Sequence, residues 1–528
     1  MTNRQRWTLV ATVIGSGAVF LDGTIVNVAL PRIGRELPHS LVAVLEGQAY
    51  VVSGYLAVLA ALLILAGGLS DHYGRKRIYT IGLAGFAVSS ALCGLSPSLE
   101  WLIVFRLVQG GAGALLVPGA LSLITQAFQG PERGRAFGIW AASTSALTVL
   151  GPVVGGTIVD TIGWRFAFLL NVPLIATALW VALRHLTESR DEDASRHFDW
   201  LGAGVAALAV GGLAFGLIRG QAQAWADGAA WVAIAIGIVA LVVFPILMAK
   251  RPNPLVPLGL FRQRAFATIN LATFFIYGAL YVTFSYQALA LQNVLGYTAV
   301  AAGAVGIPTG LLLSFLSTRV GTLAGRFGAR RFLVAGPALM AVAMLWYVRL
   351  PADSAPWKAA FETPSSLIPP IAMFVDVVPG VLLFGIGISL VVAPLTSTLM
   401  SSVPARYSGL GSAINNSISR VGQPLLGAII FIAINATFYA NLGSIAPGLN
   451  TADPGVRRTF QPLNPPPAGT SPDQLAAATQ ASMDAFHLAC LVAAVLLVMG
   501  ALVSWFGLRG QEAGELETGG EPATAKAA

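Results

Sequence analysis

Two opposite charges stand inside long apolar runs in the first quarter of the chain. Asp22 lies in the run of residues 8–30, and Arg106 lies in the run of residues 101–128. At 1.5 Å per helical residue, both lie about 10–12 Å from the same membrane boundary. Burial disfavours a charged carboxylate and a nearby cation favours it, so such a group can carry a proton. We expect Asp22 to do so and Arg106 to hold or tune it, with a fixed structural ion pair as the alternative.

Further polar and aromatic residues in apolar runs are candidates for a ligand cavity. Arg420 lies near the centre of the run of residues 408–434, and it could bind backbone carbonyls, an acidic ligand or Asp22. Tyr277 and Tyr281 share one helix face. Aromatic walls with few polar groups suit flat lipophilic ligands. Most aromatic residues in the run of residues 267–291, which contains both tyrosines, are nevertheless expected to pack or to face lipid. The predicted cavity set also contains Asn27, Gln109, Gln287, Asn415 and Asn416.

The composition indicates that these residues are held in a membrane. The chain has 528 residues, of which 56% are hydrophobic and only 10% are charged, whereas soluble domains carry roughly 25% charged residues. One bilayer crossing takes about 20 apolar residues. Lipid satisfies no backbone hydrogen bonds, so the crossings must be helices. We therefore predict an all-α membrane protein.

Fourteen apolar runs follow one another along the chain. The first six predict an N-terminal bundle over residues 1–184, and the last six predict a C-terminal bundle over residues 265–508. Two additional helices fall in a linker, residues 185–264, and residues 509–528 are expected to form a disordered tail. The runs cover residues 8–30, 49–69, 78–96, 101–128, 136–160, 165–184, 200–219, 230–249, 267–291, 298–318, 332–350, 377–399, 408–434 and 485–507.

Basic residues predict the orientation. With the N-terminus in the cytoplasm, 21 of the 31 Lys and Arg residues fall in cytoplasmic segments and 8 fall on the other side, as the positive-inside rule requires. Both termini are then cytoplasmic. The first run is longer than the apolar part of a signal peptide and carries Asp22, so we expect it to stay uncleaved. The predicted location is a bacterial cell (inner) membrane.

The sequence shows none of the motifs typical of enzymes, metal-binding proteins, ATP-driven pumps or nucleic-acid-binding proteins. Cys93 and Cys490 lack metal-ligand spacing, and the five histidines stand singly, so we predict no enzyme, metal or cofactor. None of the four lysines lies in a phosphate-binding loop, so energy must come from an ion gradient or a partner. The net charge of +8 is spread over short loops, which argues against nucleic-acid binding. A channel would leave Asp22 unexplained.

A short charged loop occurs twice. Residues 67–77 follow the second run and residues 323–331 follow the tenth. In the first copy, a glycine can form a tight turn and an acid can pair with neighbouring arginines. We interpret it as a charge latch that gates a conformational change, and a merely solvated loop is the alternative. The predicted gating residues of this loop are Gly67, Asp71, Gly74, Arg75 and Lys76.

Several of these segments resemble one transporter family. The loop at residues 67–77 is similar to the loop motif of the major facilitator superfamily. Residues 21–31, Leu-Asp-Gly-Thr-Ile-Val-Asn-Val-Ala-Leu-Pro, resemble the first-helix motif of its fourteen-span drug:proton antiporters, the EmrB/QacA group. The fourth run resembles the family's Arg-containing motif. The fifth run is similar to the antiporter motif, although Leu147 replaces a glycine, and it adds Gly151, Pro152, Gly155 and Gly156 to the gating set.

The resemblance, which covers nearly the whole chain, implies what the protein does. Two six-helix bundles with a site between them would move by alternating access. The expected activity is proton-coupled export of lipophilic compounds such as drugs, dyes or antibiotics. A dedicated exporter of an endogenous metabolite or lipid is the alternative. Asp22 is the one deeply placed acid, which favours a cationic substrate. The expected partners are the substrate, protons and the bilayer, and the chain is expected to act as a monomer.

Overall fold

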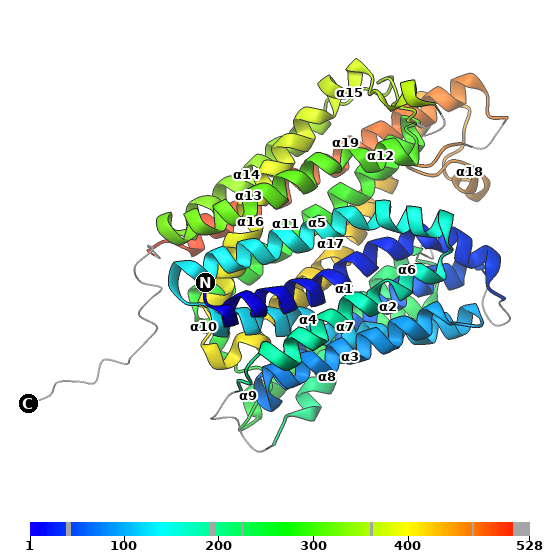
Figure 1. Cartoon of the computed structure of the whole chain (residues 1–528). Helices are drawn as coiled ribbons and strands as arrows, with labels where there is room; N and C mark the ends of the chain where they lie inside the picture. The colour runs from blue at the N-terminus through cyan, green and yellow to red at the C-terminus, as the bar shows by residue number, and fades with distance from the viewer. Residues whose placement is uncertain (39–43, 191–196, 223–224, 360–362, 467–468, 511–528) are drawn as a thin grey trace, which may run out of the picture.

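The protein is a bundle of long helices (Figure 1). The computed structural model describes residues 1–38, 44–190, 197–222, 225–359, 363–466 and 469–510, except for single side chains within helices. Within these ranges the chain contains no β-strand. Twelve of the described helices are long and apolar enough to cross a membrane. The predicted all-α membrane fold is thereby confirmed.

Two further helices bear on the predicted number of crossings. α5 (Gly130–Thr161) has 32 residues and α11 (Arg264–Leu289) has 26, and about 20 residues suffice to cross a bilayer. With them the number of crossings would reach fourteen, which stays a prediction. The proposed domain limits also stay predictions, and residues 511–528 of the expected tail lie outside the described ranges.

Helices from the first part of the chain pack against one another as one bundle. α5 and α7 pack against α1, while α4 packs between α2 and α3. The predicted sixth run forms two helices, which adjoin at Leu170. The bundle consists of α1 (Asn3–Glu36), α2 (Val44–Tyr73), α3 (Arg75–Gly94), α4 (Leu99–Ala127), α5, α6 (Arg165–Leu169) and α7 (Asn171–His185).

Helices from the last part form a second bundle. α14 packs against α16 and α19, and α11 packs against α17 and α19. Two seams join the bundles, because α5 packs along α13 and α2 packs along α17. The second bundle consists of α11, α12 (Ala299–Val305), α13 (Ile307–Phe327), α14 (Ala329–Tyr347), α15 (Ile371–Asp376), α16 (Val378–Ser401), α17 (Ser408–Ile445), α18 (Pro454–Thr459) and α19 (Pro472–Gly507).

Two helices from the middle of the chain form a hairpin at one seam. α8 (Trp200–Ala222) and α9 (Gly228–Lys250) pack together, and the short α10 (Gly259–Arg262) leads on to α11. α8 also packs against α2 and α17, where Leu213 and Leu217 cluster with Val421 of α17. The hairpin therefore contacts both bundles on the α2–α17 side.

The two ends of the molecule differ. We call the end where α2 ends at Tyr73 and α17 begins at Ser408 the latch end, and we call the opposite end the loop end. The N-terminus lies at the latch end, where Gln5 Nε2 donates to the carbonyl of Ala127 at 3.1 Å. Figure 1 shows α15 and α18 far from that terminus. At the loop end, the amide of Asn293 donates to the Leu463 carbonyl at 3.0 Å, so the long connection between α17 and α19 packs on the second bundle.

Candidate functional site

Asp22 and Arg106 meet inside the first bundle. Arg106 Nη1 donates to Asp22 Oδ2 at 2.6 Å, and each side chain is 1% exposed. Two amides complete the shell of the carboxylate: Gln109 Nε2 lies 3.2 Å and Asn171 Nδ2 lies 3.0 Å from Asp22 Oδ1. We call these four residues the Asp22 network. It connects α1, α4 and α7, so a change in the charge of Asp22 acts on three helices.

Arg106 has further partners besides the carboxylate. Its Nε donates to the Val51 carbonyl at 3.1 Å, and its Nη1 also donates to Gln109 Oε1 at 2.7 Å. The Tyr55 ring lies 3.9 Å from the guanidinium carbon, which is a cation–π distance. The structure pairs the two charges, and their part in proton coupling stays a prediction.

The network differs from the predicted set in two residues. Gln109 was expected to line a ligand cavity, but the structure places its fully buried side chain between Asp22 and Arg106. Asn171 was not predicted. Its Nδ2 also donates to Ser90 Oγ at 3.1 Å, while its Oδ1 is buried and has no hydrogen-bond partner within the described residues. The signal that could have identified Asn171 is its place as a lone amide in the sixth apolar run.

Arg420 and Tyr277 lie on neighbouring helices. Arg420 belongs to α17, which packs along α2 of the first bundle and also against α11, which carries Tyr277. Both side chains are half-buried. Their place in a ligand cavity stays a prediction.

The other predicted cavity residues whose side chains are described are spread over the second bundle. Asn415 is buried and donates to Asn270 Oδ1 at 3.1 Å. Asn416 donates to the carbonyl of Ser412, one turn earlier on α17, at 2.9 Å. Gln287 Nε2 donates to the hydroxyl of Tyr347 at 3.0 Å. The side chains of Asn27 and Tyr281 lie outside the described residues.

The predicted latch loop joins the two bundles. Asp71 Oδ1 accepts from Arg75 Nη2 at 2.9 Å and from the Gly409 backbone N–H at 3.1 Å, and Oδ2 accepts from the Leu410 N–H at 2.8 Å. These two amides belong to the first turn of α17, whose positive end favours an anion. Arg75 Nη2 donates to the Ala405 carbonyl at 2.7 Å. The Asp71–Arg75 ion pair of the first bundle therefore binds two backbone N–H groups and one carbonyl group of the second.

Gly74 and Lys76 hold the loop to its own bundle. Gly74 has φ +113°, which glycine adopts readily, and a Cβ there would lie 2.7 Å from the Glu188 carboxylate. That carboxylate accepts from the backbone N–H groups of Lys76 and Arg77 at 3.0 Å. Lys76 Nζ donates to the Leu186 carbonyl at 2.8 Å. These bonds fix the start of α3 while leaving Asp71 and Arg75 directed at α17.

Glycines allow the two bundles to approach closely at the latch end. A Cβ on Gly67 would lie 2.6 Å from the carbonyl oxygen of Gly409, and one on Gly138 would lie 2.8 Å from that of Ser317. Within the first bundle, a Cβ on Gly151 would collide with Thr24, and one on Gly155 would lie 3.2 Å from Ile25. Gly151 and Gly155 thus pack α5 against α1. Details for Pro152 and Gly156 lie outside the described residues.

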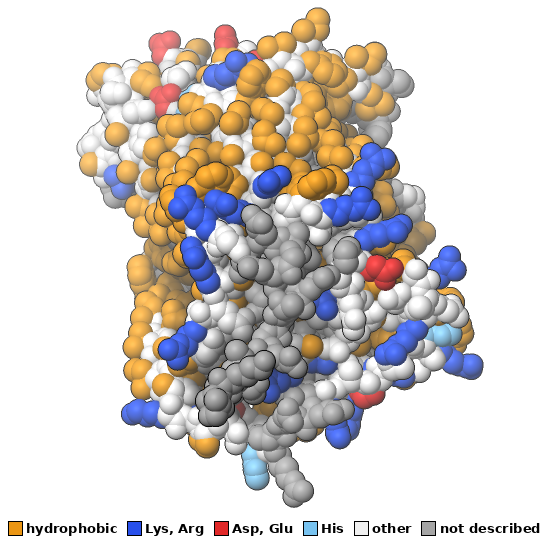
Figure 2. Space-filling model, turned by 90° about the vertical axis from the view of Figure 1, so that its left-hand side faces the viewer, with side chains coloured by type: hydrophobic (Ala, Val, Ile, Leu, Met, Phe, Trp, Pro, Cys, Tyr) orange, Lys and Arg blue, Asp and Glu red, His pale blue; other side chains and the backbone are white. Residues whose placement is uncertain are grey.

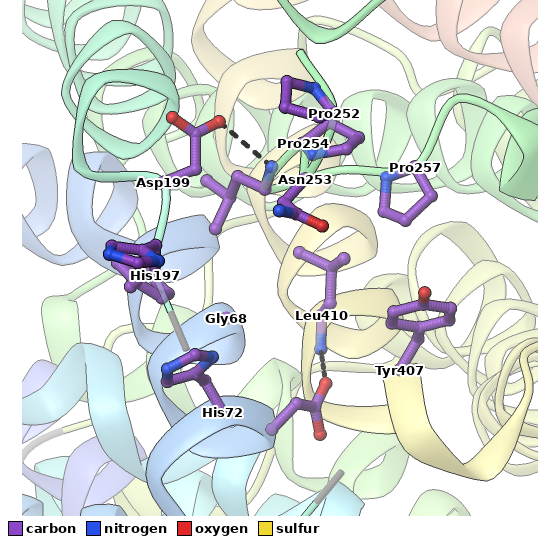
Figure 3. A pocket seen from close by; sticks show the side chains of 13 residues that line it. Gly68, His72, His197, Asp199, Pro252, Asn253, Pro254, Pro257, Tyr407 and Leu410 are labelled. Atoms are coloured by element: carbon purple, nitrogen blue, oxygen red, sulfur yellow. Dashed lines mark hydrogen bonds between the residues drawn. The ribbon is translucent and has the colours of Figure 1, made fainter. Parts of the chain in front are cut away.

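A cavity of about 270 Å³ lies beside the latch (Figure 3). Asp199, just before α8, accepts from the Leu255 N–H at 3.1 Å, and Leu255 packs on Gly68 of α2. The segments that begin and end the hairpin therefore contact the α2 turn that carries Asp71. The cavity is lined by Gly68, Asp71, His72, His197, Phe198, Asp199, Pro252, Asn253, Pro254, Leu255, Pro257, Tyr407 and Leu410.

Solved structures share this architecture at low sequence identity. The human organic anion transporter MFSD10 (TETRAN) matches with a TM-score of 0.59 and 14% identity, covering 96% of this chain and all of that one. The proton:xylose symporter XylE, solved with 6-bromo-6-deoxy-D-glucose, matches with a TM-score of 0.57 and 13% identity, covering 97% and 98%. At this identity the likeness shows the fold alone.

Sequence relatives cover the chain almost completely. The multidrug resistance protein Stp of Mycobacterium tuberculosis is 33% identical over 96% of this chain and 92% of its own length. The tetracenomycin C resistance and export protein of Streptomyces glaucescens is 32% identical over 94% and 91%. The methylenomycin A resistance protein of Bacillus subtilis is 31% identical over 82% and 89%. The family model described as Major Facilitator Superfamily matches residues 12–427, and the chain belongs to this superfamily of transporters.

Proposed function

We propose that the protein is a proton-coupled exporter of lipophilic compounds and works by alternating access. The observation that supports this best is the Asp22 network, in which a fully buried ion pair and two amides connect three helices. A buried pair contributes little net stability, because desolvation of both ions offsets their attraction. A proton-carrying role explains why the acid is placed there.

The partners of the network suit a carboxyl group that changes its charge. Protonation of Asp22 removes one charge, while Arg106 keeps its contacts with the Val51 carbonyl, with Gln109 and with the Tyr55 ring. A neutral Asp22 also gains an O–H donor. After rotation of its amide, the buried Oδ1 of Asn171, which accepts no hydrogen bond from the described residues, could accept from this O–H. Both charge states of Asp22 thus have partners.

We further propose that the latch end faces the cytoplasm. Figure 2 looks at the molecule from the left-hand side of Figure 1, where the N-terminus lies, and shows many Lys and Arg side chains on this face. Cytoplasmic segments are the ones enriched in Lys and Arg. With this orientation the structure is closed toward the cytoplasm. The bonds between the bundles at Asp71 and Arg75 must then break when the transporter opens inward.

The relatives suggest the substrate class. Two of them are resistance proteins for tetracenomycin C and methylenomycin A, and a third is a multidrug resistance protein. We therefore propose drugs, dyes or antibiotics as substrates, carried out of a bacterial cell across its inner membrane.

The proposal is tested in proteoliposomes loaded with ethidium or tetracenomycin C under an imposed pH gradient. We expect the native protein to move a compound only when the gradient is present, and Asp22→Asn, which keeps the shape of the side chain but loses its charge, to abolish the effect of the gradient. Thermal unfolding of both proteins controls for folding. Equal gradient-driven transport by Asp22→Asn would refute Asp22 as the proton carrier. If the native protein moves no compound, the drug-exporter proposal is wrong and a dedicated exporter is the next candidate.

A further inference from the structure

A second cavity, of about 190 Å³, lies in the C-terminal bundle toward the loop end. It is enclosed by α11, α12, α13 and α16, with Tyr347 of α14 at one wall. We call it the ring pocket. Drug-sized ligands occupy cavities of about 300–1,000 Å³, so the ring pocket has room for a ring system and not for a whole drug. It is lined by Phe284, Gln287, Ala288, Leu291, Ala302, Val305, Gly306, Thr309, Tyr347, Val381 and Phe384.

One wall of the ring pocket is exposed. Phe284 and Ala288 are four residues apart, so they share one face of α11. Phe284 is 46% exposed, at the mouth of the pocket. A ligand can therefore enter the pocket past Phe284.

The walls of the pocket are aromatic and carry no formal charge. Phe284 and Phe384 contact edge to face with ring centroids 5.6 Å apart, so a planar ligand that stacks on one ring would meet the other edge to face. The Gln287 amide is fixed because its Nε2 donates to Tyr347, and its carbonyl oxygen accepts no hydrogen bond from the described residues. This oxygen is an acceptor for a donor group on a bound ring.

The surroundings disfavour a cation. Asp22 is 1% exposed and is already bonded to Arg106, so it is not available to a ligand in this state. Burying an unpaired cation in an uncharged pocket is costly. The ring pocket therefore favours an uncharged ligand, whereas the preference for cationic substrates that Asp22 suggested from the sequence stays a prediction.

We propose that the ring pocket binds an uncharged planar ring system that carries a hydrogen-bond donor, with one of Phe284 and Phe384 stacking on the ring face, the other contacting the ring edge, and Gln287 accepting from the donor. This inference rests on the proposed function as an exporter of lipophilic compounds and names the substrate class. It does not depend on proton coupling, because binding requires no gradient.

The test measures binding of three ring compounds to the protein in nanodiscs, with empty nanodiscs subtracted. Acridone is neutral and has an N–H donor, N-methylacridone lacks the donor, and 9-aminoacridine is cationic. We expect the native protein and Asp22→Asn to bind acridone at least tenfold more tightly than 9-aminoacridine. Loss of proton coupling in Asp22→Asn would then leave this inference intact, which separates its failure from that of the transport mechanism.

Variants of the pocket make the test specific. Phe284→Ala and Phe384→Ala should each weaken acridone binding about 2- to 13-fold, the range for an aromatic contact of 0.5–1.5 kcal/mol. Gln287→Leu should weaken the binding of acridone but not that of N-methylacridone. Phe315→Ala is the matched control, because Phe315 lies on α13 with 74% of its surface exposed, and it should change nothing.

Three results would overturn the proposal. The first is that 9-aminoacridine binds the native protein as tightly as acridone. The second is that Phe315→Ala weakens binding as much as Phe284→Ala. The third is that Gln287→Leu affects acridone and N-methylacridone equally. Gln287→Leu and the two Phe variants alter different contacts, and Phe384 lies on another helix than Phe284 and Gln287. If one variant misfolds, the remaining two still test the proposal.

Discussion

Asp71→Asn should open the latch end, and the structure gives the size of the effect. The two carboxylate oxygens accept from different backbone amides of α17, Oδ1 from Gly409 and Oδ2 from Leu410. An amide has only one oxygen. If that oxygen keeps Gly409 and Arg75, the NH₂ group faces the Leu410 N–H, and a charge-assisted bond of 2.8 Å is lost. A hydrogen bond to a charged group contributes about 1.5–3 kcal/mol, so the closed state should lose roughly 10- to 150-fold in population relative to the open state.

The distance between two spin labels across the latch end measures the populations of the closed and open states. Spin labels replace Arg77 on α3 and Arg326 on α13, which are both exposed, after the buried Cys93 and Cys490 are changed to Ala. The native latch should give mainly the short distance of the closed state. Asp71→Asn should move most of the distribution to a longer distance.

Asp227→Asn provides the matched control. Asp227 pairs with Arg219 within the hairpin, so this variant removes an ion pair of the same type without touching the contact between the bundles. It should leave the distance distribution unchanged. If Asp71→Asn also leaves it unchanged while the protein stays folded, the bonds from Asp71 to α17 do not hold the bundles together and the latch hypothesis is wrong.

Three more predictions follow from single sites. Hydrogen bonding from Arg32 lowers the pKa of Glu36, so this pair stabilises the fold above about pH 4.5, and its contribution is lost as the pH falls. The difference in melting temperature between the native protein and Glu36→Gln should therefore shrink between pH 6 and pH 3.5. Gly138→Ala should slow transport several-fold, because its Cβ would lie 2.8 Å from a carbonyl of α13. Gly204→Ala, whose Cβ would have no atom within 4 Å, should be neutral or slightly stabilising. Initial transport rates and melting curves of both variants test this. Asp22→Glu should keep part of the gradient-driven transport that Asp22→Asn loses, and equal loss in both would show that geometry and not titration is required.

The sequence was informative wherever one residue is unusual for its surroundings. A charge in an apolar run is costly wherever it lies, so Asp22 and Arg106 could be paired from depth alone. The latch loop is recognisable because Asp71 and Arg75 stand on either side of Gly74, a residue that permits the tight turn needed to bring them together. In both cases the local pattern contains the physical cause of the contact.

The remaining parts of the site depend on contacts between distant helices. Neither the approach of Asn171 to Asp22 nor that of the Tyr55 ring to Arg106 follows from any spacing in the chain. Gln109 shows the difficulty well, since one buried amide fits a ligand cavity or an ion-pair shell equally well by residue type. Its position relative to α1 decides between them, and that position is a property of the packed bundle.

The position of Tyr55 indicates how a proton could affect the contact between the bundles. Its ring lies on Arg106 inside the first bundle, and its helix, α2, packs along α17 of the second. When Asp22 is charged, Arg106 is held by the carboxylate. When Asp22 is neutral, Arg106 depends more on the Tyr55 ring, so protonation changes the forces on a helix that contacts both bundles. The same helix carries Asp71, which accepts from the first turn of α17. Coupling between the proton site and the latch then requires no long chain of residues, since both act on α2.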